Sequence, residues 1–190
     1  MKKQDKSPVS NGEREGRKMN EAMKALYERR SIRRYKSEQI TREELDAVIR
    51  AGVCAPSGKN GQSAIIVAVQ DKATRDQLSK MNAAFLGTKS DPFYGAPTVL
   101  VVLADADSPY ALQDGSLVLG NLMNAAKAIG LGSCWINRAK EVFATEEGKA
   151  LLKKWGIPGD WVGIGHCILG YPDEDPAMKP RKENYVTYVL

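Results

Sequence analysis

The sequence predicts one globular domain of mixed class, α+β or α/β, in which helical residues outnumber strand residues. Helical and extended apolar patterns alternate along the chain, and the helical stretches are the longer ones. A chain of 190 residues can bury one sizeable core. We find no internal repeat, which excludes repeat architectures. Periodicity alone does not separate α+β from α/β.

Two helices open the ordered pattern. Apolar residues three and four positions apart predict a helix over residues 20–30, with Asn20 as its N-cap. Thr41 and Glu44 form a capping-box signature, which predicts a second helix over residues 41–52.

The middle of the chain alternates strands, helices and loops. Residues 55–63 contain two Gly, one Pro, two Ser, one Asn and one Gln, a composition typical of a loop. Such a loop either connects its neighbours or offers backbone N–H groups to a polar ligand. A strand over 64–69 follows, then a helix capped by Asp71, a break at 91–97 and a fully buried strand over 98–103.

The second half begins with the longest helical pattern, residues 110–129. A short apolar stretch over 133–136 precedes a helix over 139–155 and a strand over 161–169. Strand-forming residues at 183–190 follow a Pro-containing arm, and we expect them to pair with the sheet edge of a partner.

The positive charge is confined to one end of the chain. Residues 1–36 contain 12 Lys or Arg against 5 Asp or Glu, a balance of +7, whereas the remainder has 16 against 18, a balance of −2. A basic surface spread over the fold is therefore not expected, which argues against nucleic-acid binding. We expect residues 1–18 to be a disordered basic leader and residues 19–190 to be the single domain.

The cysteines and the single histidine predict no metal site. Cys54, Cys134 and Cys167 are odd in number, widely spaced and set in apolar surroundings, so buried free thiols in a reducing, cytoplasmic setting are expected. His166 lies inside an apolar strand pattern and is expected to be structural. No apolar run is long enough for a membrane span, and no signal peptide is recognisable.

Residues 29–35, Arg-Arg-Ser-Ile-Arg-Arg-Tyr, place four arginines at the end of the first predicted helix. Guanidinium groups bind phosphate and carboxylate oxygens through two donors at once. The same run also suits a solvated helix end. The chain has neither a GxGxxG fingerprint nor a P-loop, and it has no GxSxG elbow or Cys/His pair for nucleophilic catalysis.

Four separated motifs, read in order, resemble the FMN-dependent nitroreductase family across residues 20–190. The motifs are Arg-Arg-Ser-Ile-Arg at 29–33, Pro-Ser-Gly-x-Asn-x-Gln at 56–62, Gly-Leu-Gly-Ser-Cys-Trp-Ile at 130–136 and Lys-Pro-Arg at 179–181. The resemblance implies an α+β fold with three α-β-α layers and a mostly antiparallel central sheet. It also implies a homodimer that holds FMN at its interface and exchanges the C-terminal arm, residues 171–190, between subunits.

The resemblance assigns the phosphate of FMN to Arg29 and Ser31, with Arg30 contributing through its backbone or position and Lys179 and Arg181 arriving from the arm. It places a basic residue, Arg33, at the pyrimidine edge of the flavin. A cation there stabilises negative charge on the reduced ring. The loop expected to reach the flavin from the other subunit contains Pro56, Ser57, Gly58 and Asn60. The stretch expected against the isoalloxazine ring contains Cys134, Trp135 and Ile136.

The implied activity is that of an NAD(P)H-dependent oxidoreductase that reduces nitroaromatics, quinones or similar small acceptors by ping-pong hydride transfer through flavin N5, with either NADH or NADPH as donor. A non-catalytic flavin or tetrapyrrole binder on the same fold is the alternative. Two departures from the family pattern bear on the acceptor pocket: Ser63–Ala64 replaces a common Pro-Trp, and Asn137–Arg138 replaces an acidic residue and glycine.

Overall fold

The structure, a computed structural model, describes residues 20–189; the expected leader at residues 1–18 lies outside the described part. A four-stranded sheet in the order β1-β2-β4-β3 forms the middle layer. Its strands are β1 (Ala64–Val69), β2 (Thr98–Asp105), β3 (Gly132–Ile136) and β4 (Trp161–Gly170). All three neighbouring pairs are antiparallel, so the α+β expectation is confirmed over α/β.

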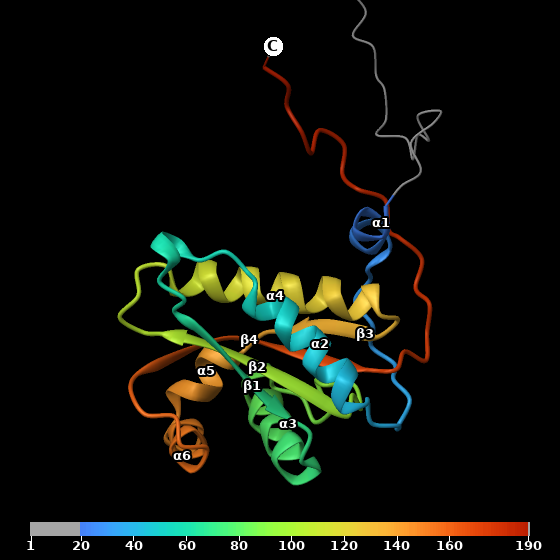
Figure 1. The fold of residues 1–190 in the computed structure, drawn as a ribbon. Helices are drawn as coiled ribbons and strands as arrows, with labels where there is room; N and C mark the ends of the chain where they lie inside the picture. Colours follow the sequence, from blue (N-terminus) through green and yellow to red (C-terminus); the bar gives the residue numbers. More distant parts are fainter. Residues whose placement is uncertain (1–19, 190) are drawn as a thin grey trace, which may run out of the picture.

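Helices cover both faces of this sheet and make the three layers visible in Figure 1. One face carries α2 (Arg42–Val53) and α4 (Ala111–Ala128). The other carries α3 (Lys72–Leu86), α5 (Ala139–Ala144) and α6 (Glu146–Lys154). The first helix, α1 (Glu21–Glu28), lies against α4, at the end of that helix nearest β3.

The central strand β2 explains why the core has two halves. Its side chains alternate between the two faces, as strand geometry requires. Val99 and Val101 pack toward α3 and α5, whereas Leu100 and Val102 pack toward α2 and α4, and all four are fully buried. The uninterrupted apolar run in the sequence is therefore that of a strand covered on both sides.

The predicted helix starts are confirmed by their caps, and one predicted helix is wrong. Thr41 and Glu44 form the expected capping box, and Asn20 and Asp71 cap α1 and α3. The helix expected over 139–155 is interrupted at Thr145, whose backbone is extended and whose hydroxyl accepts a hydrogen bond from the Gly148 N–H. Thr145 therefore ends α5 and caps α6.

The C-terminal arm, residues 171–189, carries no helix or ladder strand in the described part of the chain, and from residue 177 onward it is exposed. Figure 1 shows it passing α1 and then running away from the body of its own chain. The pairing of its end with a partner sheet stays a prediction. Within residues 20–189, every helix is too short or too polar to traverse a bilayer.

Candidate functional site at the outer edge of β3

The arginine-rich segment, residues 29–35, lies along the outer edge of β3. The Ile32 N–H donates to the Ser133 carbonyl at 3.0 Å, and Ser31 forms a parallel bridge with Ser133. Gly132 permits this approach, because a Cβ there would stand 3.1 Å from the Ile32 side chain. We call residues 29–35 the strap. The structure thus brings together two predicted motifs, the arginine motif and the stretch over residues 134–136.

The side chains of the extended strap differ in their burial. Ile32 is buried at 8% exposure and anchors the segment, whereas Arg29 and Ser31 are half-buried and Arg33 is exposed. Guanidinium and hydroxyl donors therefore stand beside the edge of the sheet, accessible to an anion. These are the residues that the resemblance assigns to FMN.

The neighbouring strap residues are engaged in holding its shape. Arg30 Nη1 donates to the carbonyls of Tyr27 and Arg29, both at 2.7 Å, which satisfies the end of α1. Arg34 Nε donates to the Asp173 carbonyl at 2.6 Å. The Tyr35 hydroxyl donates to the Ile32 carbonyl at 2.8 Å, and burial raises its pKa well above the usual range.

The stretch over 134–136 offers its backbone rather than its side chains. Cys134 and Ile136 are buried in the core, and Trp135 packs half-buried on the opposite face of the sheet. Because the Ser133 carbonyl points toward the strap, at the outer edge of β3, the backbone groups of Trp135, two residues further, point toward the same edge. Any ligand contact made here from the strand edge would therefore come from the main chain.

The loop over residues 55–63 is held by a carboxylate that sequence reasoning missed. Asp114, 3% exposed, accepts from the Gly58 N–H at 2.8 Å and from Ser63 Oγ at 2.7 Å. Gly58 lies so close to the Tyr110 ring that a Cβ would approach it to 2.4 Å. Three non-glycine residues of this loop adopt positive φ: Lys59, Asn60 and Gln62. A strained backbone of this kind persists only when its surroundings fix it.

Within one chain, the loop and the strap lie at opposite ends of α4. Asp114 holds the loop near the start of α4, while Lys127 near its end pairs with Glu28 of α1 at 3.4 Å. Asp114 and Lys127 are thirteen positions apart along α4, a rise of about 20 Å at 1.5 Å per residue. Figure 1 shows the loop and the strap at opposite ends of α4. Pro56, Ser57, Gly58 and Asn60 are therefore not brought to the strap of their own chain.

The arm begins against the strap and then leaves it. The Arg33 N–H donates to Glu174 Oε1 at 2.5 Å, and the Asp173 N–H donates to the Arg34 carbonyl at 2.9 Å. Lys179 and Arg181 are exposed further along, and within residues 20–189 they make no hydrogen bond or ion pair. The structure does not join them to Arg29.

A buried polar cluster lies beneath the end of β3. Asn82 Nδ2 donates to the Asn137 carbonyl at 2.7 Å and lies 3.5 Å from His166 Nδ1. Burial lowers the pKa of His166 to about 4, so the ring is neutral at pH 7. Among the described residues, Asn82 Oδ1 and His166 Nε2 have no hydrogen-bond partner. The structural role expected for His166 agrees with its place between the rings of Phe93 and Phe143.

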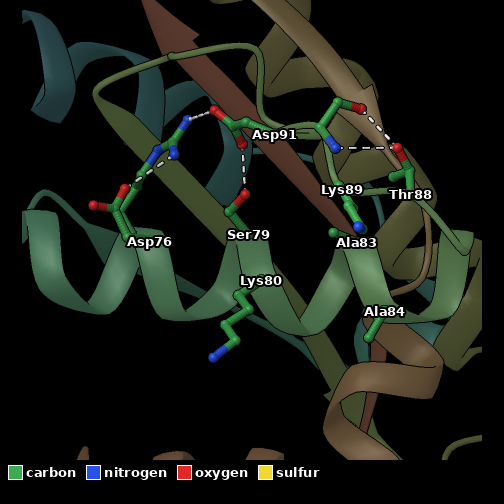
Figure 2. A pocket seen from close by; sticks show the side chains of 10 residues that line it. Asp76, Ser79, Lys80, Ala83, Ala84, Thr88, Lys89 and Asp91 are labelled. Carbon is green, nitrogen blue, oxygen red and sulfur yellow. Dashed lines mark hydrogen bonds and ion pairs between the residues drawn. The ribbon is translucent and has the colours of Figure 1, made fainter.

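Two cavities of the described chain lie away from these motifs. One, of about 540 Å³, is bordered by α3 and residues 88–91 (Figure 2), and the other, of about 530 Å³, lies beside α6. Neither is lined by a residue predicted to hold FMN. We take the strap as the candidate site because it brings two of the predicted FMN-binding motifs together.

The donors at the strap suit FMN. Arg29 and Ser31 are half-buried donors beside the outer edge of β3, and Arg33 adds an exposed guanidinium. A phosphate dianion is held best by several charge-assisted hydrogen bonds, and a flavin ring by main-chain groups and a nearby cation. The residues present therefore fit an FMN phosphate and ring along this edge.

Comparisons with known proteins agree with this fold. The model of the nitroreductase family matches residues 26–91 and 81–171. An Archaeoglobus fulgidus protein, whose name proposes an NADH dehydrogenase or NAD(P)H nitroreductase, is 36% identical over 163 residues, covering 83% of this chain and 88% of that protein. The NAD(P)H-type FMN reductase of Bacillus subtilis is 28% identical over 186 residues, covering 86% of this chain and 70% of that protein.

A solved structure bears out the expected architecture. A nitroreductase with bound FMN from Bacteroides fragilis superposes with a TM-score of 0.81 at 28% identity, covering 90% of this chain and 100% of that chain. The nitroreductase-like fold expected from the four motifs is thereby confirmed.

Proposed function

Because this chain belongs to the nitroreductase family, we propose that it is an FMN-dependent NAD(P)H oxidoreductase that reduces small acceptors such as nitroaromatics or quinones. The names of the relatives support the general function: the Bacillus subtilis protein is an FMN reductase that uses NAD(P)H, and the Bacteroides fragilis nitroreductase is solved with bound FMN. The choice of acceptor and the ping-pong order are the specific parts of the proposal.

The single observation that carries the proposal is the strap on the edge of β3. It sets Arg29, Ser31 and Arg33 beside a strand whose main-chain groups face outward. In this arrangement Arg29 and Ser31 would hold the phosphate, Arg30 would support them from the end of α1, and Arg33 would supply positive charge at the flavin ring.

FMN bound here would supply the redox chemistry, passing two electrons as a hydride equivalent from NAD(P)H to a small acceptor. The chain itself provides orientation and charge. No protein nucleophile is required, which agrees with the buried, raised-pKa thiol of Cys167 and the buried neutral ring of His166.

A homodimer completes the site. The loop over 55–63 lies at the opposite end of α4 from the strap of its own chain. A second copy would bring its Pro56, Ser57, Gly58 and Asn60 to this edge. Lys179 and Arg181 would arrive on an exchanged arm. Large exposed apolar side chains on the arm and on α1 and α4 are suited to such an interface: Tyr185, Val186, Tyr188, Leu26, Tyr27, Leu112 and Leu117.

The visible spectrum of the purified full-length protein is the first test. We expect the absorbance of oxidised flavin, present as isolated or restored by adding FMN, and bleaching by NADH or NADPH under anaerobic conditions. Protein that takes up no FMN would refute the proposal. Protein that holds FMN but is bleached by neither nucleotide would favour the non-catalytic binder.

A double substitution tests the phosphate contacts. Charge-assisted hydrogen bonds contribute about 1.5–3 kcal/mol each. Arg29→Ala with Arg181→Ala should therefore release FMN readily, as measured by flavin fluorescence during dilution. Arg42→Ala with Arg50→Ala, two exposed arginines of α2, is the matched control and should retain FMN.

A further inference from the structure

The turn over residues 91–96 is tied to the fold by one carboxylate. Asp91 accepts from the backbone N–H groups of Phe93 at 2.9 Å and Gly95 at 2.7 Å, and from two α3 side chains, Ser79 Oγ and Arg75 Nη2. Figure 2 shows Asp91 facing Ser79 across this junction. Burial raises the pKa of Asp91, but these hydrogen bonds more than offset it, so the pKa lies below its usual value. Asp91 therefore attaches the turn to α3.

The fixed turn holds a tyrosine in an unusual backbone conformation. Tyr94 has a φ of +53°, which bulky side chains rarely adopt. Its neighbour Phe93 is fully buried against His166, with ring centroids 5.2 Å apart, whereas Tyr94 is 43% exposed. Apolar packing explains Phe93 but does not explain why a strained position carries an exposed aromatic ring.

The ring of Tyr94 faces the strap. The guanidinium carbon of Arg33 lies 6.0 Å from the centroid of the Tyr94 ring, within reach of a cation–π contact. The Arg33 N–H is held by Glu174. Arg33 is thus fixed at its backbone by the arm and at its guanidinium by the ring.

We infer that Tyr94 is a positioning residue of the flavin site, whose ring keeps the Arg33 guanidinium directed where the flavin binds. The inference rests on the proposed function, since it takes Arg33 as a flavin contact. The inference explains the positive φ of Tyr94, because this backbone conformation lets the Tyr94 ring contact Arg33 while Phe93 packs in the core.

Tyr94→Asn separates this role from a structural one. Asn adopts positive φ more easily than Tyr, so the change relieves backbone strain while removing the ring. We expect an unchanged or higher melting temperature, FMN binding weakened about two- to fivefold, the equivalent of an exposed cation–π contact, and a more negative midpoint potential of the bound flavin. Tyr94→Phe keeps the ring and should match the wild type.

A double-mutant cycle tests whether Tyr94 affects FMN affinity and midpoint potential through Arg33. In the Arg33→Ala background, Tyr94→Asn should change neither FMN affinity nor midpoint potential further. Phe85→Asn, which removes a comparably exposed aromatic from α3, is the matched control for FMN affinity and should leave it unchanged. Unaltered affinity and potential in Tyr94→Asn, or effects that add to those of Arg33→Ala, would overturn the inference.

A flavin-free measurement distinguishes failure of this inference from failure of the proposed function. In the apo protein, the Tyr94 ring should shift the side-chain proton resonances of Arg33 upfield, and the shift should vanish in Tyr94→Asn. Absence of the shift in the wild type refutes the contact. A wild type that shows the shift but binds no FMN refutes the proposed function, and with it the role of Tyr94, while leaving the contact intact.

Discussion

At the scale of single residues, Asp114 is the anchor of the loop over 55–63. Asp114→Ala removes a buried carboxylate and leaves the partly buried Gly58 N–H and Ser63 hydroxyl without their acceptor. We expect the free energy of unfolding to fall by about 1–3 kcal/mol, measured by urea denaturation, and the Gly58 amide to exchange faster with solvent. Asp107→Ala removes an exposed carboxylate and should change stability by less than about 0.5 kcal/mol. Equal losses in both variants would contradict the anchor.

His166 makes stability depend on pH. Burial lowers its pKa to about 4, below its ordinary value of 6.5. Between these values the unfolded chain binds a proton that the folded chain does not, so the free energy of unfolding decreases as pH falls through this window. Above both pKa values, the depressed pKa of His166 contributes about 3 kcal/mol to the free energy of unfolding, at 1.36 kcal/mol per pKa unit. In His166→Gln, urea denaturation at pH 7, 5.5 and 4.5 should show a shallower decline, whereas parallel declines would disprove this linkage.

At the scale of elements, the strap is attached to the sheet through Ile32. Ile32→Ala removes a buried side chain that packs over Gly132, so we expect a loss of about 2–5 kcal/mol in unfolding free energy. The residue 32 amide should lose hydrogen-exchange protection, and FMN affinity should fall with it. Ile129→Ala, at a site 43% exposed, provides the comparison and should affect all three measurements weakly. A strap still protected in Ile32→Ala would show that other contacts hold it.

The elements themselves were largely predictable, because their signals are local. Apolar spacing and caps located most of the helices and three of the four strands, and the run over 98–103 indicated burial on both faces. The strand β3 was recognised only as a short apolar stretch over 133–136, because it is too short to show a strand pattern of its own. The break at Thr145 was missed because the apolar pattern continues through it. Cys54 was wrongly expected to be buried; it is exposed just after α2.

The site was predictable only in part, since its contacts join distant residues. The arginines of the strap and the stretch over 134–136 were found as motifs and do lie together. Asp114 and Tyr94 carry no sequence signal, because their roles depend on which residues face them: Gly58 and Ser63 in one case, Arg33 in the other. The contributions of Lys179 and Arg181 stay a prediction.

At the scale of the whole molecule, removing the end of the C-terminal arm tests whether two subunits share the flavin site. A chain ended after residue 175 keeps the contacts of Asp173 and Glu174 with the strap but loses Lys179, Arg181 and the exposed apolar end. Sedimentation should show weaker dimerisation, and FMN titration a lower affinity, while the circular dichroism of the body is unchanged because the lost side chains are exposed in their own chain. A truncated dimer with undiminished FMN affinity would contradict arm exchange.

Because Cys54 is exposed, it provides a single site for attaching a spectroscopic label to the natural chain. Cys134 and Cys167 are buried, and burial raises the pKa of Cys167 to about 12, so a maleimide dye should label Cys54 alone. Cys54 directly precedes the loop that is proposed to reach the partner's flavin. A fluorophore there would be quenched by flavin across the interface but not within one chain, which makes subunit assembly and cofactor loading readable in a single titration without any substitution.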